Sequence, residues 1–373
     1  MAESMDKIFM TGGTGFSGSI ILKALLQNKE IETIWVLIRD EGAGCKQLFK
    51  SIGKMNHKKK IVPIKGDITS PNFGLSNSEL QDIQSADEVY HLAANTSLSN
   101  EEGKKKHIFD TNIKGTRNLL EIFKDARHLK KLFYFSSAYS CGKASGTIKE
   151  AWLDKPSQFR NYYEESKWLS EDLIRQYHHK YNLPFIILRP SIISCGDQFQ
   201  PENSKIHTIY HYGHILKKAY HLQKKKHYPI ALVGKPHSTL NIMPIEDITK
   251  LLLEIRGSGK INMIFNLTNE INCTLQSVLG GIQEGIGFME GYILKEGLDF
   301  SSLSDSERFA FLNTRPFWEY ALGSNLRWAV ENTKEMRMKL GLNAKDNKWV
   351  KEHLKRYFIN VVINEKQKSA VQI

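Results

Sequence analysis

The stretch KIFMTGGTGFSGSIILKALLQNKEIETIWVLIR, residues 7–39, decides the fold. A short apolar run (residues 8–10) ends in a glycine-rich turn, and an amphipathic segment with apolar residues at helical spacing follows. A second apolar run, residues 34–38, closes the unit. This pattern predicts a strand, a tight turn, a helix and a second strand. We therefore expect a cofactor domain in the N-terminal half of the chain.

The glycines of the turn have the spacing G-x-x-G-x-x-G, at residues 12, 15 and 18. Gly12 permits the tight turn, Gly15 lets the backbone approach a pyrophosphate, and Gly18 lets the helix pack close to the strand. The phosphates would bind at the helix N-terminus, where free N–H groups and the helix dipole attract anions. Glycine turns also join strands to helices for structural reasons alone, so the flanking elements are what favour a dinucleotide site.

The end of the second strand bears on the type of dinucleotide. An acidic residue there binds the ribose 2′-hydroxyl of NAD, whereas an arginine accommodates the 2′-phosphate of NADP. Arg39 holds this position and Asp40 follows it. The sequence favours NADP, and Asp40 keeps NAD as the alternative.

The composition is typical of a soluble globular protein. The 373 residues are 41% hydrophobic and 25% charged, which is enough for one large α/β domain and a smaller one. No apolar run reaches about 18 residues, so no transmembrane helix is expected. The polar start MAESMDK does not resemble a signal peptide. Four widely separated cysteines favour reduced thiols in a cytoplasmic protein.

The net charge of +12 includes three lysine runs, at residues 58–60, 104–106 and 224–226. Such runs are usually solvated loop charge. They would also suit an acidic partner, such as a phosphorylated cofactor, coenzyme A or an acidic acyl carrier protein. No nucleic-acid-binding motif accompanies them, so nucleic acid is not an expected partner.

Two further predicted strands end in residues suited to a cofactor. Residues 61–69 (IVPIKGDIT) end at Asp67, which would meet an adenine edge or would simply hold a turn. Residues 88–97 (EVYHLAANTS) end in Ala93 and Ala94, where larger side chains would collide with a cofactor. We interpret His91, within this strand, as a packed core histidine.

Polar side chains follow in the next segments. Residues 110–126 predict a helix with Asn112 near its start, and KLFYFSSAYSCG (131–142) predicts a strand that ends in paired serines. Tyr163 and Lys167 are four residues apart, so they share one face of a helix. This pair means little alone, but it carries more weight after a βαβ pattern and a serine-bearing strand end.

In combination, these motifs resemble the extended short-chain dehydrogenase/reductases. TGGTGFSG, GDIT, HLAAN, NIKGT, FSSAYS, Tyr163-x-x-x-Lys167 and LRPSI occur in that family's order, over roughly residues 5–270. The segments LVGKPHSTLNIMPIEDITKLLL (232–253) and IFNLTNEINCTL (264–275) look like the thioester-reductase and fatty acyl-CoA reductase branch.

The C-terminal stretch resembles the same branch more weakly. Those proteins tend to have an aromatic residue followed by Asp, whereas Ala329 follows Trp328 in this chain. No adenylation or carrier domain accompanies the sequence, so an acyl group is expected to arrive on a separate molecule.

The resemblance implies an α/β fold with a Rossmann-type doubly wound parallel sheet and a smaller, mostly helical C-terminal substrate domain. Residues 1–270 would form the NADP-binding domain, with a substrate-side insertion at about 197–235, and residues 271–373 would form a substrate-binding cap. A homodimer is compatible with this organisation.

The resemblance also implies roles for individual residues. Tyr163 would donate a proton, and Lys167 would lower the pKa of Tyr163 and hold the nicotinamide ribose. Ser137 would hydrogen-bond the substrate carbonyl, with Ser136 as the alternative. Asn112 would order its helix around the lysine and a water relay. The residues implied for NADPH binding are Thr11, Gly12, Thr14, Gly15, Phe16, Gly18, Arg39, Asp67, Ile68, Ala93, Ala94, Asn112, Tyr163, Lys167, Pro190, Ser191 and Ile192.

The reaction implied by this resemblance is hydride transfer from NADPH to an acyl thioester, carried by coenzyme A or a carrier protein, or to the derived aldehyde. The product would be an aldehyde, an alcohol or both. One alternative is an extended-family oxidoreductase or epimerase acting on a nucleotide sugar or a small polar carbonyl compound. The other is a non-catalytic NADP-binding regulator, against which the intact set Ser137, Tyr163 and Lys167 argues.

The second half of the chain offers weaker signals. Histidines 207, 211 and 214 have a spacing that could bring metal ligands together, but no Glu or Cys completes a set. We interpret them as a polar helix face and expect no metal. The tail, residues 361–373, looks frayed. Aromatic residues in the expected cap would line an apolar pocket or form its core: Phe309, Phe311, Phe317, Trp318 and Tyr320.

Overall fold

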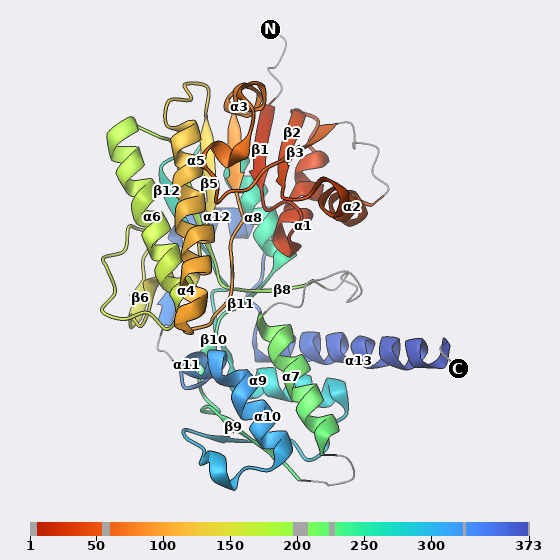
Figure 1. Cartoon of the computed structure of the whole chain (residues 1–373). Coiled ribbons are helices and arrows are strands. Elements are labelled where there is room, and N and C mark those ends of the chain that lie inside the picture. The colour runs from red at the N-terminus through yellow and green to blue at the C-terminus, as the bar shows by residue number, and fades with distance from the viewer. Residues whose placement is uncertain (1–5, 54–59, 197–207, 224–227, 324–325, 372–373) are drawn as a thin grey trace.

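A seven-stranded, fully parallel sheet forms the centre of the larger lobe (Figure 1). In this computed structural model the described residues are 6–53, 60–196, 208–223, 228–323 and 326–371. The strand order reverses between β1 and β4, which opens a crevice at the carboxyl ends of these strands. The predicted doubly wound α/β fold is thus confirmed. From edge to edge the strands are β12 (Met263–Leu267), β7 (Ile186–Pro190), β5 (Lys131–Phe135), β4 (Glu88–His91), β1 (Asp6–Thr11), β2 (Ile31–Ile38) and β3 (Ile61–Lys65).

Apolar residues alternate between the two faces of this sheet because successive side chains of a strand point in opposite directions. Ile8 and Met10 belong to one buried cluster, and Phe9 between them belongs to another. Helices α1 (Phe16–Leu26), α2 (Glu41–Ile52), α8 (Ile245–Gly257) and α12 (Lys334–Lys339) contribute to the first cluster. Helices α3 (Asn77–Gln84), α5 (Gly115–Phe123) and α6 (Tyr162–Tyr181) contribute to the second.

The helix predicted over residues 110–126 begins earlier and contains an irregular turn. It starts as α4 (Glu102–Phe109), passes through a π-helical turn over Asp110–Lys114, and continues as α5. Such turns displace side chains from regular helical positions and are frequent at functional sites.

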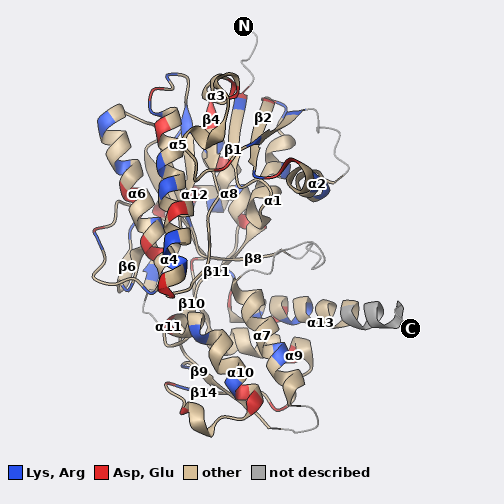
Figure 2. Cartoon of the chain, in the orientation of Figure 1, with Lys and Arg blue, Asp and Glu red and all other residues tan. Residues whose placement is uncertain are grey.

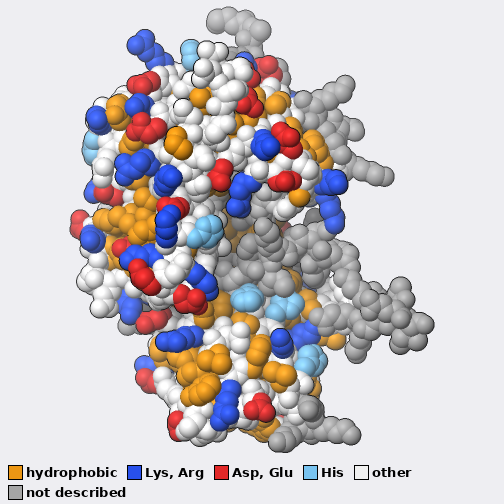
Figure 3. Space-filling model, viewed as in Figure 1, with side chains coloured by type: hydrophobic (Ala, Val, Ile, Leu, Met, Phe, Trp, Pro, Cys, Tyr) orange, Lys and Arg blue, Asp and Glu red, His pale blue; other side chains and the backbone are white. Residues whose placement is uncertain are grey.

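The smaller lobe lies below the carboxyl edge of the sheet in Figure 1. Apolar residues of α7, α9 and α13 form its core, and hydrophobic side chains gather on its outer face in Figure 3. Its helices are α7 (Thr208–Leu222), α9 (Leu275–Ile286), α10 (Asp305–Thr314), α11 (Trp318–Ala321) and α13 (Asn347–Val371). Its strand pairs are β9 (Ile230–Val233) with β14 (Tyr292–Lys295), and β10 (Thr239–Leu240) with β13 (Cys273–Thr274).

Two short parallel pairs complete the described strands. The strands β8 (Ile192–Ser194) and β11 (Ile242–Pro244) pair below the sheet, and β6 (Gly146–Ile148) pairs with β15 (Leu326–Trp328). The core of the smaller lobe takes residues from both sides of position 270, while α12 returns to pack on α8. The domain boundary at residue 270 stays a prediction.

The end of the chain differs from the expectation. Helix α13 continues to Val371, so the interpretation of residues 361–373 as frayed was wrong for most of this stretch. In the described parts of the chain, no helix is both long enough and apolar enough to span a membrane.

We predict that Gly18→Ala destabilises the fold. A methyl group at this position would overlap the carbonyl oxygen of Gly12, so the glycine turn would have to shift. Overpacking of this kind costs about 1–3 kcal/mol in the free energy of unfolding, which urea denaturation measures. Gly257→Ala is the matched control, because a Cβ there meets no atom within 4 Å. Equal stability of the two variants would contradict the close approach of helix and turn.

Candidate active site

The glycine turn forms a backbone cradle at the crevice. Gly12 has a φ of 77°, and a Cβ on it would lie 2.6 Å from the amide nitrogen of Ala93. Helix α1 begins at Phe16 with no side-chain cap and no acidic residue in its first turn. Its first N–H groups and the positive end of its dipole are therefore suited to an anion such as a phosphate.

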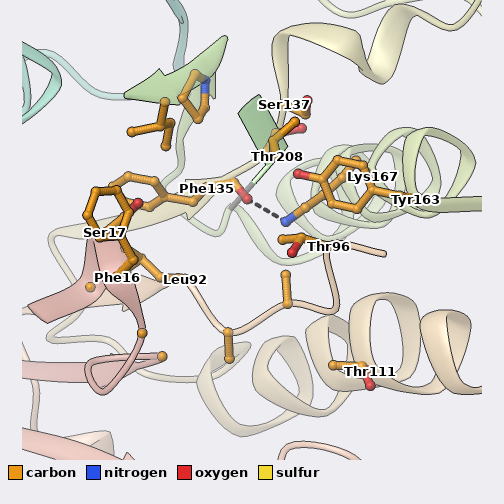
Figure 4. A pocket seen from close by; sticks show the side chains of 18 of the residues that line it. Phe16, Ser17, Leu92, Thr96, Thr111, Phe135, Ser137, Tyr163, Lys167 and Thr208 are labelled. Carbon is orange, nitrogen blue, oxygen red and sulfur yellow. Dashed lines mark hydrogen bonds between the residues drawn. The ribbon is translucent and has the colours of Figure 1, made fainter. Parts of the chain in front are cut away.

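A cavity of about 630 Å³ runs from this cradle to the smaller lobe. Figure 4 shows Phe16 and Ser17 of α1 on one side and Ser137, Tyr163 and Lys167 on the other. All residues predicted for the cofactor and catalytic site line this cavity except Asn112. The structure therefore brings the predicted set together, while the individual roles stay predictions.

The polar side chains at the centre of the cavity come from α6 and the end of β5. The Lys167 ammonium donates a hydrogen bond to the carbonyl oxygen of Phe135, at 2.6 Å (Figure 4). Ser136 donates its hydroxyl proton to Glu171, away from the reacting groups. The Ser137 hydroxyl accepts from the Tyr139 amide at 3.2 Å and interacts with Tyr163. This arrangement favours Ser137 over Ser136 as the contact of a substrate carbonyl.

Burial governs the ionisation of these groups. It raises the pKa of Tyr163 to about 12, and the hydrogen bond from Ser137 offsets only part of this rise. Burial also lowers the pKa of Lys167 to about 7, against the opposing charge of Glu171. The protein groups alone thus shift the Tyr163 pKa upward, opposite to the lowering expected from Lys167.

Asn112 lies behind the cavity wall rather than in it. Its Oδ1 accepts from the Asn95 amide at 2.7 Å. Its Nδ2 donates to the Asn95 carbonyl at 2.9 Å and to Ser166 Oγ at 2.8 Å. Ser166 is on α6, between Tyr163 and Lys167 in sequence. Asn112, which lies within the π-helical turn, therefore holds α6 to the loop after β4.

His91 is a core residue, as interpreted from the sequence. Its two ring nitrogens are hydrogen-bonded to Thr11 Oγ1 at 2.7 Å and to Thr116 Oγ1 at 3.2 Å. Burial, together with the charge of Lys167, lowers its pKa to about 3. It is therefore neutral at physiological pH and ties the strand before the glycine turn to α5.

Sequence reasoning missed most of the part of the cavity that belongs to the smaller lobe. These residues come from segments far apart in the chain, so no local pattern marks them. Of the five aromatic residues considered, Phe317 and Tyr320 line the cavity, whereas Phe309, Phe311 and Trp318 lie outside its lining. The lining residues of this end include Tyr212, Leu240, Leu275, Val278, Phe317, Tyr320 and Ala321.

A second group was also missed, on the helix that contains the π-helical turn. His107, Asp110, Thr111 and Lys114 line the cavity opposite the glycine turn. Their spacing of three and four residues is that of one helix face, so a helical period was present here, but the polar residue types gave no sign that this face lines a cavity.

The histidines considered as metal ligands do not form such a site in the described residues. His207 lies outside the described residues. His211 is near Phe317, and His214 packs against Tyr357 and Phe358. No group of three or more His, Cys, Asp or Glu side chains in the described parts could hold a metal ion.

The cavity residues fit a nicotinamide dinucleotide. The uncapped helix N-terminus and the glycine turn suit the pyrophosphate. The buried hydroxyl of Ser191, which also lines the cavity, has no hydrogen-bond partner among the described residues. The family resemblance implies that Ser191 lies beside the nicotinamide. Together these features suit a ligand that carries both phosphates and a polar ring.

The fold and the site define the chain as an extended short-chain dehydrogenase/reductase. The family model of NAD-binding proteins described as male sterility protein matches residues 10–251, so the chain belongs to this family. The match and the relatives below place it in the thioester-reductase and fatty acyl-CoA reductase branch.

Two curated relatives and one solved structure illustrate the likeness. The fatty acyl-CoA reductase wat of Drosophila melanogaster is 30% identical over 224 residues, which are 50% of this chain and 42% of that protein. The non-canonical nonribosomal peptide synthetase cpsA of Aspergillus campestris is 26% identical over 284 residues, 70% of this chain and 25% of that protein. The chain thus spans less than half the length of either relative.

The terminal R domain from the myxalamid PKS-NRPS biosynthetic pathway has the same fold. Its TM-score is 0.75 at 20% identity, over 98% of this chain and 92% of that chain.

The pKa of Lys167 predicts a pH dependence of stability. Because the folded-state pKa is about 7, below the usual 10.5, the unfolded chain binds more protons between these values. Burial of Lys167 therefore does not lower the free energy of unfolding above about pH 10.5. As the pH falls from 10.5 toward 7, the free energy of unfolding decreases by about 1.4 kcal/mol per pH unit. Relative to Lys167→Met, the wild-type protein should therefore gain stability from pH 7 to pH 10. Urea unfolding across this range measures the difference, and parallel profiles would show an unperturbed lysine.

Proposed function

We propose that the protein is an NADPH-dependent reductase of an acyl thioester, or of the derived aldehyde. The observation that supports this proposal is a single cavity that joins three features. These are a phosphate-binding glycine turn, the Ser137–Tyr163–Lys167 group and an apolar wall from the smaller lobe. The first suits a dinucleotide, the second a carbonyl, and the third an acyl chain.

The apolar wall favours an acyl substrate over a nucleotide sugar. A sugar nucleotide needs charged and polar partners, whereas Leu240, Leu275 and Val278 offer hydrocarbon surface. Phe317 and the ring of Tyr320 add aromatic surface. The names of the relatives, a fatty acyl-CoA reductase and a peptide synthetase, also favour an acyl substrate.

The chain's residues would carry out the proton chemistry. A bound nicotinamide dinucleotide supplies the hydride. Tyr163 donates its hydroxyl proton to the carbonyl oxygen, and Ser137 hydrogen-bonds the same oxygen as negative charge develops on it. With a thioester, the hemithioacetal then collapses to an aldehyde and a thiol, and a second reduction gives the alcohol. Lys167 holds the ribose beside Tyr163, and Asn112 fixes the helix that carries both.

The local structure around Arg39 supports NADP as the cofactor. Asp40, the residue that kept NAD open, is the N-cap of α2 and accepts a hydrogen bond from the Ala43 amide. The Asp40 carboxylate therefore caps α2 and is not directed at a ribose. Arg39 lines the cavity, whereas Asp40 does not. Among the described ion pairs, none involves Arg39. A 2′-phosphate would supply the partner for its guanidinium.

The carrier of the acyl group is proposed to be coenzyme A or an acidic carrier protein. The lysine run on α4 does not contribute to this proposal. Its three members pair with Glu101, Glu102 and Asp110, so acidic residues lie on both sides of the run along the helix (Figure 2). This run is exposed charge on a helix, balanced by neighbouring carboxylates, and most of the other two runs lies outside the described residues.

The first test is a substrate panel for NADPH oxidation. It comprises long and short acyl-CoA thioesters, an acyl carrier protein thioester, a matching aldehyde, and NADH as the cofactor control. We expect thioester-dependent oxidation with an aldehyde or alcohol product. Oxidation with the aldehyde alone would restrict the protein to carbonyl reduction. No oxidation with any substrate, despite NADPH binding, would overturn the proposal.

Tyr163→Phe should remove turnover and retain the cofactor. Loss of a general acid lowers kcat by about 100-fold or more, while the affinity for NADPH stays within about twofold. Stopped-flow turnover and fluorescence titration of NADPH measure the two quantities. Wild-type turnover in this variant would show that Tyr163 is not the proton donor.

Arg39→Asp should reverse the cofactor preference. Loss of a charged hydrogen bond to the 2′-phosphate, with a like charge in its place, should weaken NADPH binding by at least about tenfold. NADH binding should not weaken. Asp40→Asn is the matched control, since asparagine caps helices as well as aspartate does. An unchanged preference in Arg39→Asp, or a changed one in Asp40→Asn, would contradict the assignment.

A further inference from the structure

Tyr320 connects the smaller lobe to the first turn of the helix that carries Tyr163 and Lys167. It belongs to α11, and its ring lines the cavity. Its hydroxyl donates to Glu164 Oε1 at 2.6 Å and accepts from Asn161 Nδ2 at 2.9 Å. Two residues that flank Tyr163 in sequence therefore share one hydroxyl from the other lobe.

These two partners define the start of α6. Asn161 is the N-cap, and its Oδ1 accepts from the Glu164 amide at 3.0 Å. The side chain of Glu164 is fully buried, and a buried carboxylate requires compensation of its charge. Without Tyr320, one of its oxygens would lose a short hydrogen bond, and the helix start would lose the contact that fixes its cap.

Arg160 provides the rest of the compensation. Its guanidinium lies 3.2 Å from Glu164 Oε1, and its amide donates to Glu164 Oε2 at 3.0 Å. It also donates to the carbonyl of Gly142 at 2.5 Å and lies 5.4 Å from the centre of the Tyr320 ring. Tyr320 thus contacts both members of the ion pair, and its position affects the charge beside Tyr163.

The ring of Tyr320 is fixed from the substrate side. It packs edge-on against Tyr139, with centroids 5.3 Å apart, and Tyr139 also lines the cavity. Tyr139 follows Ser137 by two residues and packs in turn against Trp328, at 5.4 Å. An acyl group in the cavity would therefore contact the ring of Tyr320, and the hydroxyl of the same residue is hydrogen-bonded to the start of α6.

We propose that Tyr320 is a positioning residue that fixes the first turn of α6, and hence Tyr163, through Glu164 and Asn161. It acts through these residues and not on the reacting carbonyl. Tyr320 thus connects the apolar wall of the cavity to the helix turn that carries the proton donor, Tyr163. The inference rests on the proposed function, in which Tyr163 donates the proton.

Tyr320→Phe tests this role, because it removes one oxygen and retains the ring. The uncompensated charge of Glu164 would disfavour loss of a proton by Tyr163. We expect kcat to fall about tenfold, with KM for the acyl substrate and the NADPH affinity within about twofold. Glu164→Gln and the double variant complete a cycle. The losses should be less than additive if Tyr320 acts through Glu164.

Glu319→Gln is the matched control. Glu319 precedes Tyr320 on α11 and forms an exposed ion pair with Lys143, at 3.0 Å, across the same junction. This variant should keep wild-type kcat. An equal loss in Glu319→Gln would show that only general docking of the lobes matters. A loss in Tyr320→Phe confined to KM would make Tyr320 a substrate-wall residue and overturn the proposal.

A second measurement is independent of turnover. Hydrogen exchange of the peptide that covers residues 161–166 should be faster in Tyr320→Phe than in the wild type, and unchanged in Glu319→Gln. Unchanged exchange in Tyr320→Phe would overturn the positioning role. If the wild-type protein reduces no thioester or aldehyde, the proposed function fails, and the exchange result still decides whether Tyr320 fixes the helix.

Discussion

The buried ion pair between Glu171 and Arg189 is the interaction on which the site depends. The carboxylate of Glu171, on α6, lies 2.6 Å from one guanidinium nitrogen of Arg189 and 2.9 Å from another. Arg189 is fully buried within β7, and Glu171 is 3% exposed. Removing one partner of such a pair leaves an uncompensated buried charge and costs about 3–5 kcal/mol. The pair therefore fixes α6 against the sheet.

Both members of this pair organise further parts of the site. Glu171 accepts hydrogen bonds from Ser136 and Ser140, which keeps the segment after β5 in place around Ser137. Arg189 donates to the carbonyls of Lys149 and Ala151 in the loop after β6. Lys167, one turn earlier on α6, donates to the Phe135 carbonyl. The reacting side chains are thus held by a network behind the cavity.

The parts of the site that local sequence could predict are those fixed by local geometry. Gly12 is required by its backbone φ of 77°, and Gly18 by its close approach to the Gly12 carbonyl. Tyr163 and Lys167 face one way because they lie four residues apart on a helix. The role of Asp40 was missed: it was considered only for the cofactor, although an acidic residue just before a helix is a common N-cap. Because Asp40 caps α2, it is a weaker candidate for binding the ribose 2′-hydroxyl of NAD.

The parts that the sequence could not predict depend on distant contacts. Glu164 and Tyr320 are 156 residues apart, and a charged residue in a helix gives no sign that it will be fully buried. The same holds for Glu171 and Arg189. Asn112 is placed behind the cavity wall by its contacts with Asn95 and Ser166, which are distant in sequence. In each case the partner is supplied by tertiary structure, and only the residue type is visible in the sequence.

Burial also suits the site to proton donation. A tyrosine with a pKa of about 12 keeps its proton at physiological pH, so Tyr163 is ready to act as an acid. An alkoxide that forms on a reduced carbonyl is more basic than a phenolate, and transfer of the proton to it is therefore favourable. Lys167, with a pKa of about 7, changes its charge readily when an anion comes near, because charges interact strongly in a buried site. In the proposed reaction, the negative charge that develops on the carbonyl oxygen is such an anion. Lys167 in its charged form would therefore help Tyr163 and Ser137 to stabilise this charge.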